Sequence, residues 1–360
     1  MSFRRWFRTL HRYAGAVISA FILLLAVSGG ALIFKDEIWR LQYPELAVAP
    51  PAETAARHAS AFHAIEQTFG DRIRMIRTPR EGVAAYHVYL DGGEALVSPG
   101  NFSVIDEWAW YGSLTGVLAE LHIHLLAGTA GRTAVGTLGL LLGAMALSGL
   151  YLWWPVRRQF RLQSLAPAGL GRAFLLRFHR DLGVLALPLV LLFGLTGAGV
   201  VFSGSAEAVL SMLLGSENGA EAAPAASTPG GVPAPGVAMI ARAQAALPDG
   251  RLMSWSPPRA GSAVHYFRFR MPGEIHPNGR STVYVDANDG SVLQRSDARQ
   301  APRGTRAMHW LYPLHAVQVG GWGYRALAVL SALALAVIAC SGLLGFIKAT
   351  RRSKRSQLHA

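Results

Sequence analysis

AGAVISAFILLLAVSGGALIF, residues Ala14–Phe34, is the first of four long apolar stretches that decide the fold of this 360-residue chain. The others are Thr133–Trp154, Leu182–Phe202 and Ala326–Ile347, and all four are 21 or 22 residues long without a charged residue. A helix of about 20 apolar residues crosses the hydrocarbon core of a bilayer. The sequence therefore predicts four transmembrane helices.

The first stretch follows four arginines, as the apolar part of a signal peptide would. It is longer than the roughly 7–15 apolar residues of such a peptide, however, and the sequence Phe34-Lys35-Asp36-Glu37 offers no small-residue cleavage site. We expect this helix to be retained.

The net charge of +13 is unevenly distributed along the chain. Residues 1–12, 155–181 and 348–360 together carry +14, and the remainder of the chain carries −1. Cytoplasmic segments next to transmembrane helices are rich in Lys and Arg. We therefore place both termini and the middle loop of this membrane protein, which contacts lipid, in the cytoplasm, and the charge can be explained without a nucleic-acid partner.

The single cysteine, Cys340, restricts the possible cofactors. One thiol cannot form an intramolecular disulfide, a structural zinc site or an iron–sulfur cluster. There is no C-x-x-C-H sequence for covalent haem. Any redox cofactor must therefore have other ligands, and histidine is the main candidate.

The two long segments on the outer side predict small α+β domains. Each begins with a helix-like stretch, Ala52–Phe69 or Val237–Leu247, followed by alternating strand-like residues. Asp289-Gly290 is a hairpin signal, and Gly215–Gly236 has the composition of a flexible linker. We expect the histidines of these domains to be surface residues, namely His58, His63, His87, His265 and His276.

The predicted fold class is a membrane four-helix bundle, built from two helix–domain–helix repeats, with two periplasmic α+β domains. The expected boundaries are transmembrane helix 1 with its cytoplasmic N-terminus at 1–35, domain 1 at 36–120, helix 2 at 121–155, a cytoplasmic loop at 156–180, helix 3 at 181–203, the linker at 204–236, domain 2 at 237–308, helix 4 at 309–347 and a cytoplasmic tail at 348–360.

The two halves of the chain resemble each other. A shift of 168 residues aligns helix 1 with helix 3 and matches His11 with His179, and a shift of 193 aligns helix 2 with helix 4 and matches His122 with His315. Parallel repeats are related by an axis along the membrane normal, so inward-pointing equivalents would face each other. We predict an inner pair, His11 with His179, and an outer pair, His122 with His315.

Two such pairs are what two b-type haems with two histidine ligands each require. Four repeat-matched arginines, Arg12, Arg180, Arg132 and Arg325, are possible partners of the haem propionates, or else simply anchors at the membrane interface. The histidines themselves could also be interfacial anchors. We interpret the matched glycines Gly29, Gly197, Gly149 and Gly342 as helix-packing positions.

The outer pair leaves an alternative open. His122 lies 11 residues before Thr133, about 16 Å along a straight helix. Either the outer site lies at the membrane surface or the chain folds back at Gly128–Gly131. His124 and His309 are nearby alternative ligands without a repeat partner.

Several of these motifs resemble the PepSY-associated transmembrane helix family. The motifs are LHRYAG at Leu10–Gly15, FHRDLG at Phe178–Gly183, SGLYLWWP at Ser148–Pro155, Leu314-His315, and YVDANDGSV at Tyr284–Val292, which resembles the end of a PepSY domain. The likeness covers nearly the whole chain except the linker, and it is weaker in the first outer domain.

The resemblance implies an inner-membrane ferric-siderophore reductase that carries electrons outward through haem b and releases Fe(II). The chain has no G-x-G-x-x-G sequence and no expected flavin or nicotinamide site, so the electron donor would be a separate cytoplasmic protein or a quinol. The alternatives are a non-catalytic module that binds or modulates a periplasmic protein or peptide, and an accessory of metal or haem uptake. The carrier requires four inward-facing histidines, and the binding module requires none.

Overall fold

The computed structural model describes residues 2–47, 54–166, 169–217, 230, 236–259 and 261–358. The chain forms two compact units. The helical unit comprises Met1–Ile33, Leu118–Ser203 and Leu314–Ala360, and the sheet unit comprises Phe34–Val117 and Gly204–Pro313.

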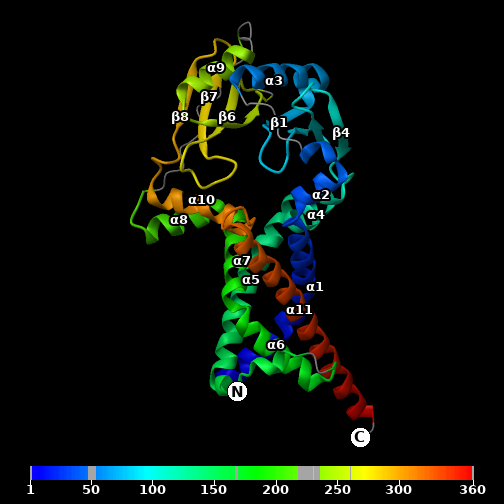
Figure 1. Cartoon of the computed structure of the whole chain (residues 1–360). Coiled ribbons are helices and arrows are strands. Elements are labelled where there is room, and N and C mark those ends of the chain that lie inside the picture. The colour runs from blue at the N-terminus through cyan, green and yellow to red at the C-terminus, as the bar shows by residue number, and fades with distance from the viewer. Residues whose placement is uncertain are drawn as a thin grey trace. The chain divides into compact units, whose positions relative to one another are not determined.

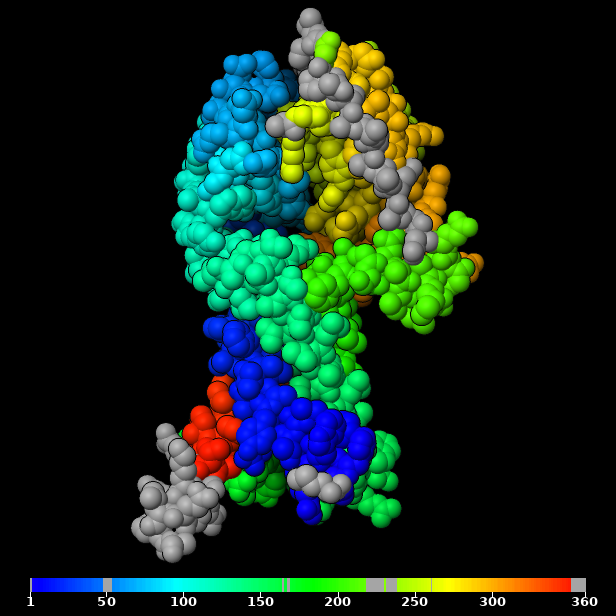
Figure 2. Space-filling model, turned by 180° about the vertical axis from the view of Figure 1, so that it is seen from behind, coloured from blue at the N-terminus to red at the C-terminus, as the bar shows by residue number. Residues whose placement is uncertain are grey.

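Long helices form most of the helical unit (Figure 1). They are α1 (Phe3–Leu32), α5 (Gly128–Trp153), α6 (Arg172–Leu185), α7 (Leu187–Val201) and α11 (Gly321–Leu358). α1 packs against α11 and α5, while α5 packs against α7 and α11 packs against α6. Figure 2 shows the blue surface of α1 beside the red surface of α11. Each helix therefore has neighbours from both halves of the chain.

Three helices of the described residues are long and apolar enough to span a membrane: Phe3–Leu32, Gly128–Gln159 and Gly321–Thr350. A fourth span exists if α6 and α7 are taken as one bent span. The continuous helix expected at Leu182–Phe202 is instead broken at Ala186, where α6 and α7 meet at 69°. Pro188 lies at the start of α7. Its ring has no N–H to donate and clashes with the preceding turn, so a straight helix cannot pass through it.

The chain folds back before α5. The short helix α4 (Leu114–His124) ends at a corner where Leu125 and Leu126 have φ values of 48° and 58°, and α5 starts at Gly128 with φ 54°. The chain therefore folds back before α5 and does not continue as one straight helix. The corner begins at Leu125, three residues before the expected Gly128.

A second corner precedes α11. The helix α10 (Arg303–His315) is followed by Val317 at φ 56°, and by Gly320 and Gly321 at 75° and 59°. A left-handed conformation is unusual for leucine and strained for β-branched valine. The surrounding structure must therefore hold both corners in place.

The sheet unit contains one antiparallel sheet with the strand order β4-β3-β2-β1-β5-β6-β7-β8. The strands are β1 (Ile73–Arg77), β2 (Tyr86–Leu90), β3 (Gly93–Val97), β4 (Val104–Ala109), β5 (Arg251–Ser256), β6 (Val264–Arg270), β7 (Ser281–Asp286) and β8 (Val292–Ser296). β1 and β5 pair through Ile76 with Trp255 and Arg77 with Ser254. The two expected outer domains thus share one sheet instead of forming separate bodies, because the free edge of each half is covered by the other.

One face of the sheet is apolar and is covered by α3 (Ala55–Phe69) and α9 (Gly236–Ala246), which lie side by side (Figure 1). Phe62 stacks on Trp255 at a ring-centroid distance of 5.2 Å in this core. Both helices lie where the sequence predicts them, and the predicted hairpin at Asp289-Gly290 joins β7 to β8. On the other face, α2 (Lys35–Gln42) contributes Trp39 to a smaller apolar cluster.

The expected linker is partly helical. Residues Ser203–Leu213 form α8, which packs against α10, where Thr305 donates a 2.6 Å hydrogen bond to Glu207. The segments 218–229 and 231–235 of the expected linker lie outside the described residues. The remaining short helices are η1 (Pro44–Ala47), η2 (Gly70–Arg72), η3 (Trp154–Gln159) and η4 (Leu162–Leu165).

Four of the five histidines expected at the surface of the outer domains are buried. The exposed fractions are 4% for His58, 1% for His87, 8% for His265 and 2% for His276. Burial is possible because His58 bonds Tyr86 at 3.0 Å and His87 bonds Glu94 at 2.8 Å. Only His63 is exposed, as expected.

Candidate functional site

The inner histidine pair lies between α1 and α6. The ring centroids of His11 and His179 are 6.3 Å apart, with ring planes at 78°. Two imidazoles bound to one metal through bonds of about 2.0–2.1 Å would have centroids roughly 6 Å apart. The spacing of this pair therefore suits one metal ion between the two rings.

Hydrogen bonds orient both inner rings in the same way. His179 Nδ1 lies 2.9 Å from the carbonyl oxygen of Ile338, which can only accept, so Nδ1 carries the proton. His11 Nδ1 lies 2.8 Å from Ser148 Oγ, whose own proton is donated to Met145 O. Both Nδ1 atoms are therefore donors, and both Nε2 lone pairs remain available for a metal.

Each inner ring also lies against a glycine of a neighbouring helix. A Cβ atom at Gly342 would be 3.0 Å from His179 Cε1, and one at Gly149 would be 3.4 Å from His11 Cε1. Larger side chains at these positions would push the rings away from their present places.

A cavity of about 270 Å³ opens beside the inner pair. Its lining includes both histidines, Gly15 and Gly183, and is otherwise mostly apolar. At Gly183 an added Cβ would meet no atom within 4 Å. A flat apolar group could therefore approach the backbone beside the two rings.

The outer pair is arranged similarly between α4 and α10. The centroids of His122 and His315 are 6.0 Å apart, with ring planes at 27°. The Nδ1 atoms lie 3.1 Å from Leu25 O and 3.1 Å from Phe193 O, respectively. Because these carbonyls accept, both Nε2 atoms are again unprotonated and available.

Glycines hold the outer rings even more closely. A Cβ at Gly29 would be 2.6 Å from His122 Cε1, and a Cβ at Gly197 would be 2.7 Å from His315 Cε1. We expected these glycines to be helix-packing positions. They also leave the space that the imidazole rings occupy. In three cases, Gly29, Gly197 and Gly342, the glycine lies four residues after the residue whose carbonyl binds the ring.

The four candidate arginines lie in different surroundings. Arg180 lines the inner cavity and forms an ion pair with Asp181 at 2.6 Å. Arg12 lies over the rings of Tyr13 and Phe346, Arg132 is exposed, and Arg325 donates to Ile33 O at 2.8 Å. Of the four, the structure places only Arg180 at the cavity.

The two alternative ligands, His124 and His309, have neighbours of their own. His124 pairs with Glu120 at 3.0 Å on its own helix. His309 lies in the sheet unit near Arg268 and Arg280, and burial together with these cations lowers its pKa to about 4.

The donor set fits a metal held in a macrocycle better than a free ion. Among the described residues, no group of three or more His, Cys, Asp or Glu side chains could hold a metal ion. A haem would need only two imidazoles from the protein, the number that each pair offers, because the porphyrin would supply the other nitrogens.

Comparison with known proteins identifies the family. The family model described as the PepSY-associated TM region matches residues 8–349. Among curated proteins, no relative matches. The chain belongs to the PepSY-associated TM region family and is a membrane protein.

Proposed function

We propose that this protein is an inner-membrane b-type haem protein that carries electrons across the bilayer and reduces a ferric siderophore on the outer side. The observation that carries the proposal is the geometry of the four histidines. They form two pairs with centroid distances of 6.3 and 6.0 Å, and every Nδ1 atom is fixed by an oxygen acceptor.

The scaffold is a four-helix bundle with two repeated halves. α1 with α11 and α5 with α7 are equivalent contacts between the halves, and α1 with α5 and α6 with α11 are equivalent contacts within them. The shifts of 168 and 193 residues that match the histidines also match Gly29 with Gly197 and Gly149 with Gly342. Contacts that repeat with the sequence support an axis that brings equivalent side chains together.

The two pairs are far enough apart to serve opposite faces of the membrane. His11 and Gly29, which seats His122, are 18 residues apart on α1, or about 27 Å at about 1.5 Å per residue. The hydrocarbon core is about 30 Å thick. The basic segments 1–12 and 155–181 support a cytoplasmic position for the His11 end.

The side chains of this protein would hold and tune two haems. When bound, haem supplies a one-electron Fe(III)/Fe(II) couple. The Nδ1–H bonds to oxygen fix each ring and make it a more basic ligand. Arg180 is the candidate partner for a propionate at the inner cavity.

The absorption spectrum of the detergent-purified protein, made with ample haem, tests the proposal. We expect a Soret band that shifts on reduction with dithionite, and about two haems per chain. His11→Ala and His315→Ala should each remove one haem, and the exposed His63→Ala serves as the control and should remove none. A protein without a Soret band would contradict the proposal and favour the alternative of a binding module.

A further inference from the structure

The polar face of the sheet carries a row of basic side chains. Arg77 on β1 pairs with Ser254 on β5, which pairs with Arg268 on β6. Directly paired residues lie on the same face, and neighbouring strands are about 4.8 Å apart. The two arginines therefore flank a short serine side chain across three adjacent strands.

The segment after β6 adds further cations to this face. Burial and the nearby charges of Arg280, Arg268, His309 and Arg77 lower the pKa of His276 to about 2, so its ring is neutral. The ring stacks on Tyr312 of α10 at 5.2 Å, with planes at 20°. The basic groups of two strands, a loop and α10 therefore lie close to His276; they are Arg77, Arg268, Arg280 and His309.

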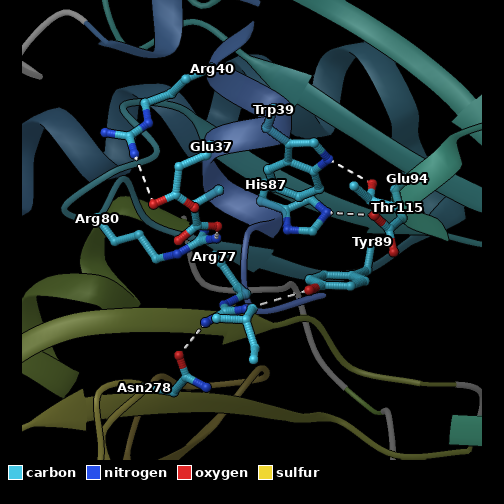
Figure 3. A network of polar contacts seen from close by, with 12 residues as sticks. Glu37, Trp39, Arg40, Arg77, Arg80, His87, Tyr89, Glu94, Thr115 and Asn278 are labelled. Carbon is cyan, nitrogen blue, oxygen red and sulfur yellow. Dashed lines mark hydrogen bonds and ion pairs between the residues drawn. The ribbon is translucent and has the colours of Figure 1, made fainter. Parts of the chain in front are cut away.

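Arg77 is held rigidly within this group. Its guanidinium donates to Asn278 and, at 3.5 Å, to the hydroxyl of Tyr89 (Figure 3). Arg80 lies beside it and donates to Asp36 at 3.0 Å. Because these side chains are already held in place, a ligand would meet preorganised donors. Binding would then cost little side-chain entropy of the protein.

Four buried donor or acceptor atoms of the group have no hydrogen-bond partner among the described residues. They are Nη1 of Arg80, Nε of Arg280, Nε2 of His276 and Oε1 of Glu274. An unsatisfied buried polar group is unfavourable, more so when it is charged, and in native structures it often marks a missing ion or water. Two of the four belong to guanidinium groups, which need an acceptor.

The charges of the group are not balanced. Four guanidinium groups, those of Arg77, Arg80, Arg268 and Arg280, face two nearby carboxylates. Asp36 pairs with Arg80, and Glu274 accepts from Met271 N and Ser281 Oγ. Lys35 and the bonded pair His87–Glu94 lie next to the group and add no net negative charge.

We propose that this polar face is a binding site for carboxylate oxygens, and that its ligand is an anionic ferric chelate with free carboxylate groups. Arginine forks bind carboxylates in a bidentate manner, and the tyrosine hydroxyls of Tyr89 and Tyr266 supply further hydrogen bonds. The identity of the ligand as a ferric chelate rests on the proposed reductase function, whereas the affinity for carboxylate does not.

Calorimetric titration of the full-length protein in detergent tests the site, with ferric citrate, iron-free citrate, inorganic phosphate and ferrioxamine B as probes. We expect ferric citrate to bind more tightly than phosphate and than ferrioxamine B, which carries no carboxylate, and its affinity to fall with ionic strength. Arg280→Gln and Arg268→Gln should each weaken ferric citrate at least tenfold. Arg268→Lys should recover only part of the affinity, because it keeps the charge and loses the fork.

The matched control is Arg74→Gln, an exposed arginine on β1 that pairs with Asp91. It should leave the affinity unchanged. Equal affinity of the wild type and the two Gln variants, with unchanged melting temperatures, would overturn the site, and tighter binding of phosphate would overturn the chelate assignment.

The haem spectrum of the same samples separates this inference from the proposed function. Arginine-dependent citrate binding by a protein without a Soret band would reject the reductase and the ferric chelate while retaining the carboxylate site. A normal haem spectrum without citrate binding would reject the carboxylate site alone.

Discussion

Both units of this protein bury histidines, but they bury them differently. In the sheet unit, His87 uses Nε2 to bond Glu94, and His265 Nδ1 accepts from Trp255, so the rings are held by neighbouring side chains. In the helical unit, His122 and His179 bond backbone carbonyls through Nδ1 and leave Nε2 without a hydrogen bond among the described residues. His87 also leaves one ring nitrogen, Nδ1, without a partner among the described residues. The feature that distinguishes the helical unit is that its histidine rings lie in pairs, with centroids 6.3 and 6.0 Å apart.

A large side chain at Gly29, which lies against the ring of His122, should have the largest effect. Because a Cβ at Gly29 would lie 2.6 Å from the His122 ring, Gly29→Leu should displace that ring and abolish the outer haem. Haem content per chain, measured by the Soret absorbance, should fall by about half. Gly323→Ala is the control, since Gly323 is exposed and its Cβ would meet nothing within 4 Å. A normal haem content in Gly29→Leu would contradict the role of this glycine.

Acid should destabilise the sheet unit progressively. Burial lowers the pKa of His87 and of His265 to about 4, against an ordinary value of 6.5. Between these values the unfolded chain binds more protons, so the stability contributed by the neutral rings is complete above pH 6.5 and is lost as the pH falls toward 4. Hydrogen exchange of the strands, corrected for the intrinsic rate, should show protection falling from pH 7 to 5, and constant protection would refute the assignment.

Removing the buried imidazole of His87 should destabilise the sheet unit without affecting haem. His87→Ala leaves the carboxylate of Glu94 without its partner, and hydrogen bonds to charged groups contribute about 1.5–3 kcal/mol. We expect the free energy of unfolding to fall by about 2–3 kcal/mol in denaturant titrations. His63→Ala should change it by less than about 0.5 kcal/mol, since His63 is exposed. Loss of haem in His87→Ala would erase the distinction between the two groups of histidines.

Removal of the Ser148 hydroxyl, which bonds His11 Nδ1, should have the smallest effect. The Nδ1 atom of His11 bonds a side chain, Ser148 Oγ, whereas the other three rings bond carbonyls that no substitution removes. Ser148→Ala should weaken haem binding at the inner site about 10–100-fold, as for other partners of metal ligands. Ser28→Ala is the control, because His122 keeps its bond to Leu25 O, and equal haem affinities of the two variants would contradict the orienting role of Ser148.

Much of the candidate site was predictable from the sequence. Apolar length gives the long helices, and the shifts of 168 and 193 residues pair His11 with His179 and His122 with His315. The periodicity of the outer segments also gives α3, α9 and the hairpin between β7 and β8. These features depend on local residue patterns or on internal repetition, and both can be observed in a single chain.

Other features were missed because they depend on contacts between distant residues. The pairing of β1 with β5 joins positions such as Ile76 and Trp255, and nothing local in either strand specifies the partner. The burial of His87 depends on its bond to Glu94 on β3, a residue that pairs with Tyr89 and lies diagonally across from His87. The break at Ala186 had a local signal in Pro188, which the uniform hydrophobicity of the stretch outweighed.

The sequence by itself determined that the chain enters a membrane, which segments are basic, and which residues of the two halves match when the chain is shifted along itself, because hydrophobicity, charge and residue order can be read from one chain. Only the tertiary structure decided that glycines seat the imidazoles, that each Nδ1 is bound and each Nε2 left available, and that the arginines of two expected domains meet on one sheet face. The physical reason is that hydrogen bonding, steric fit and charge density depend on distances between side chains, and those distances exist only after the chain has folded.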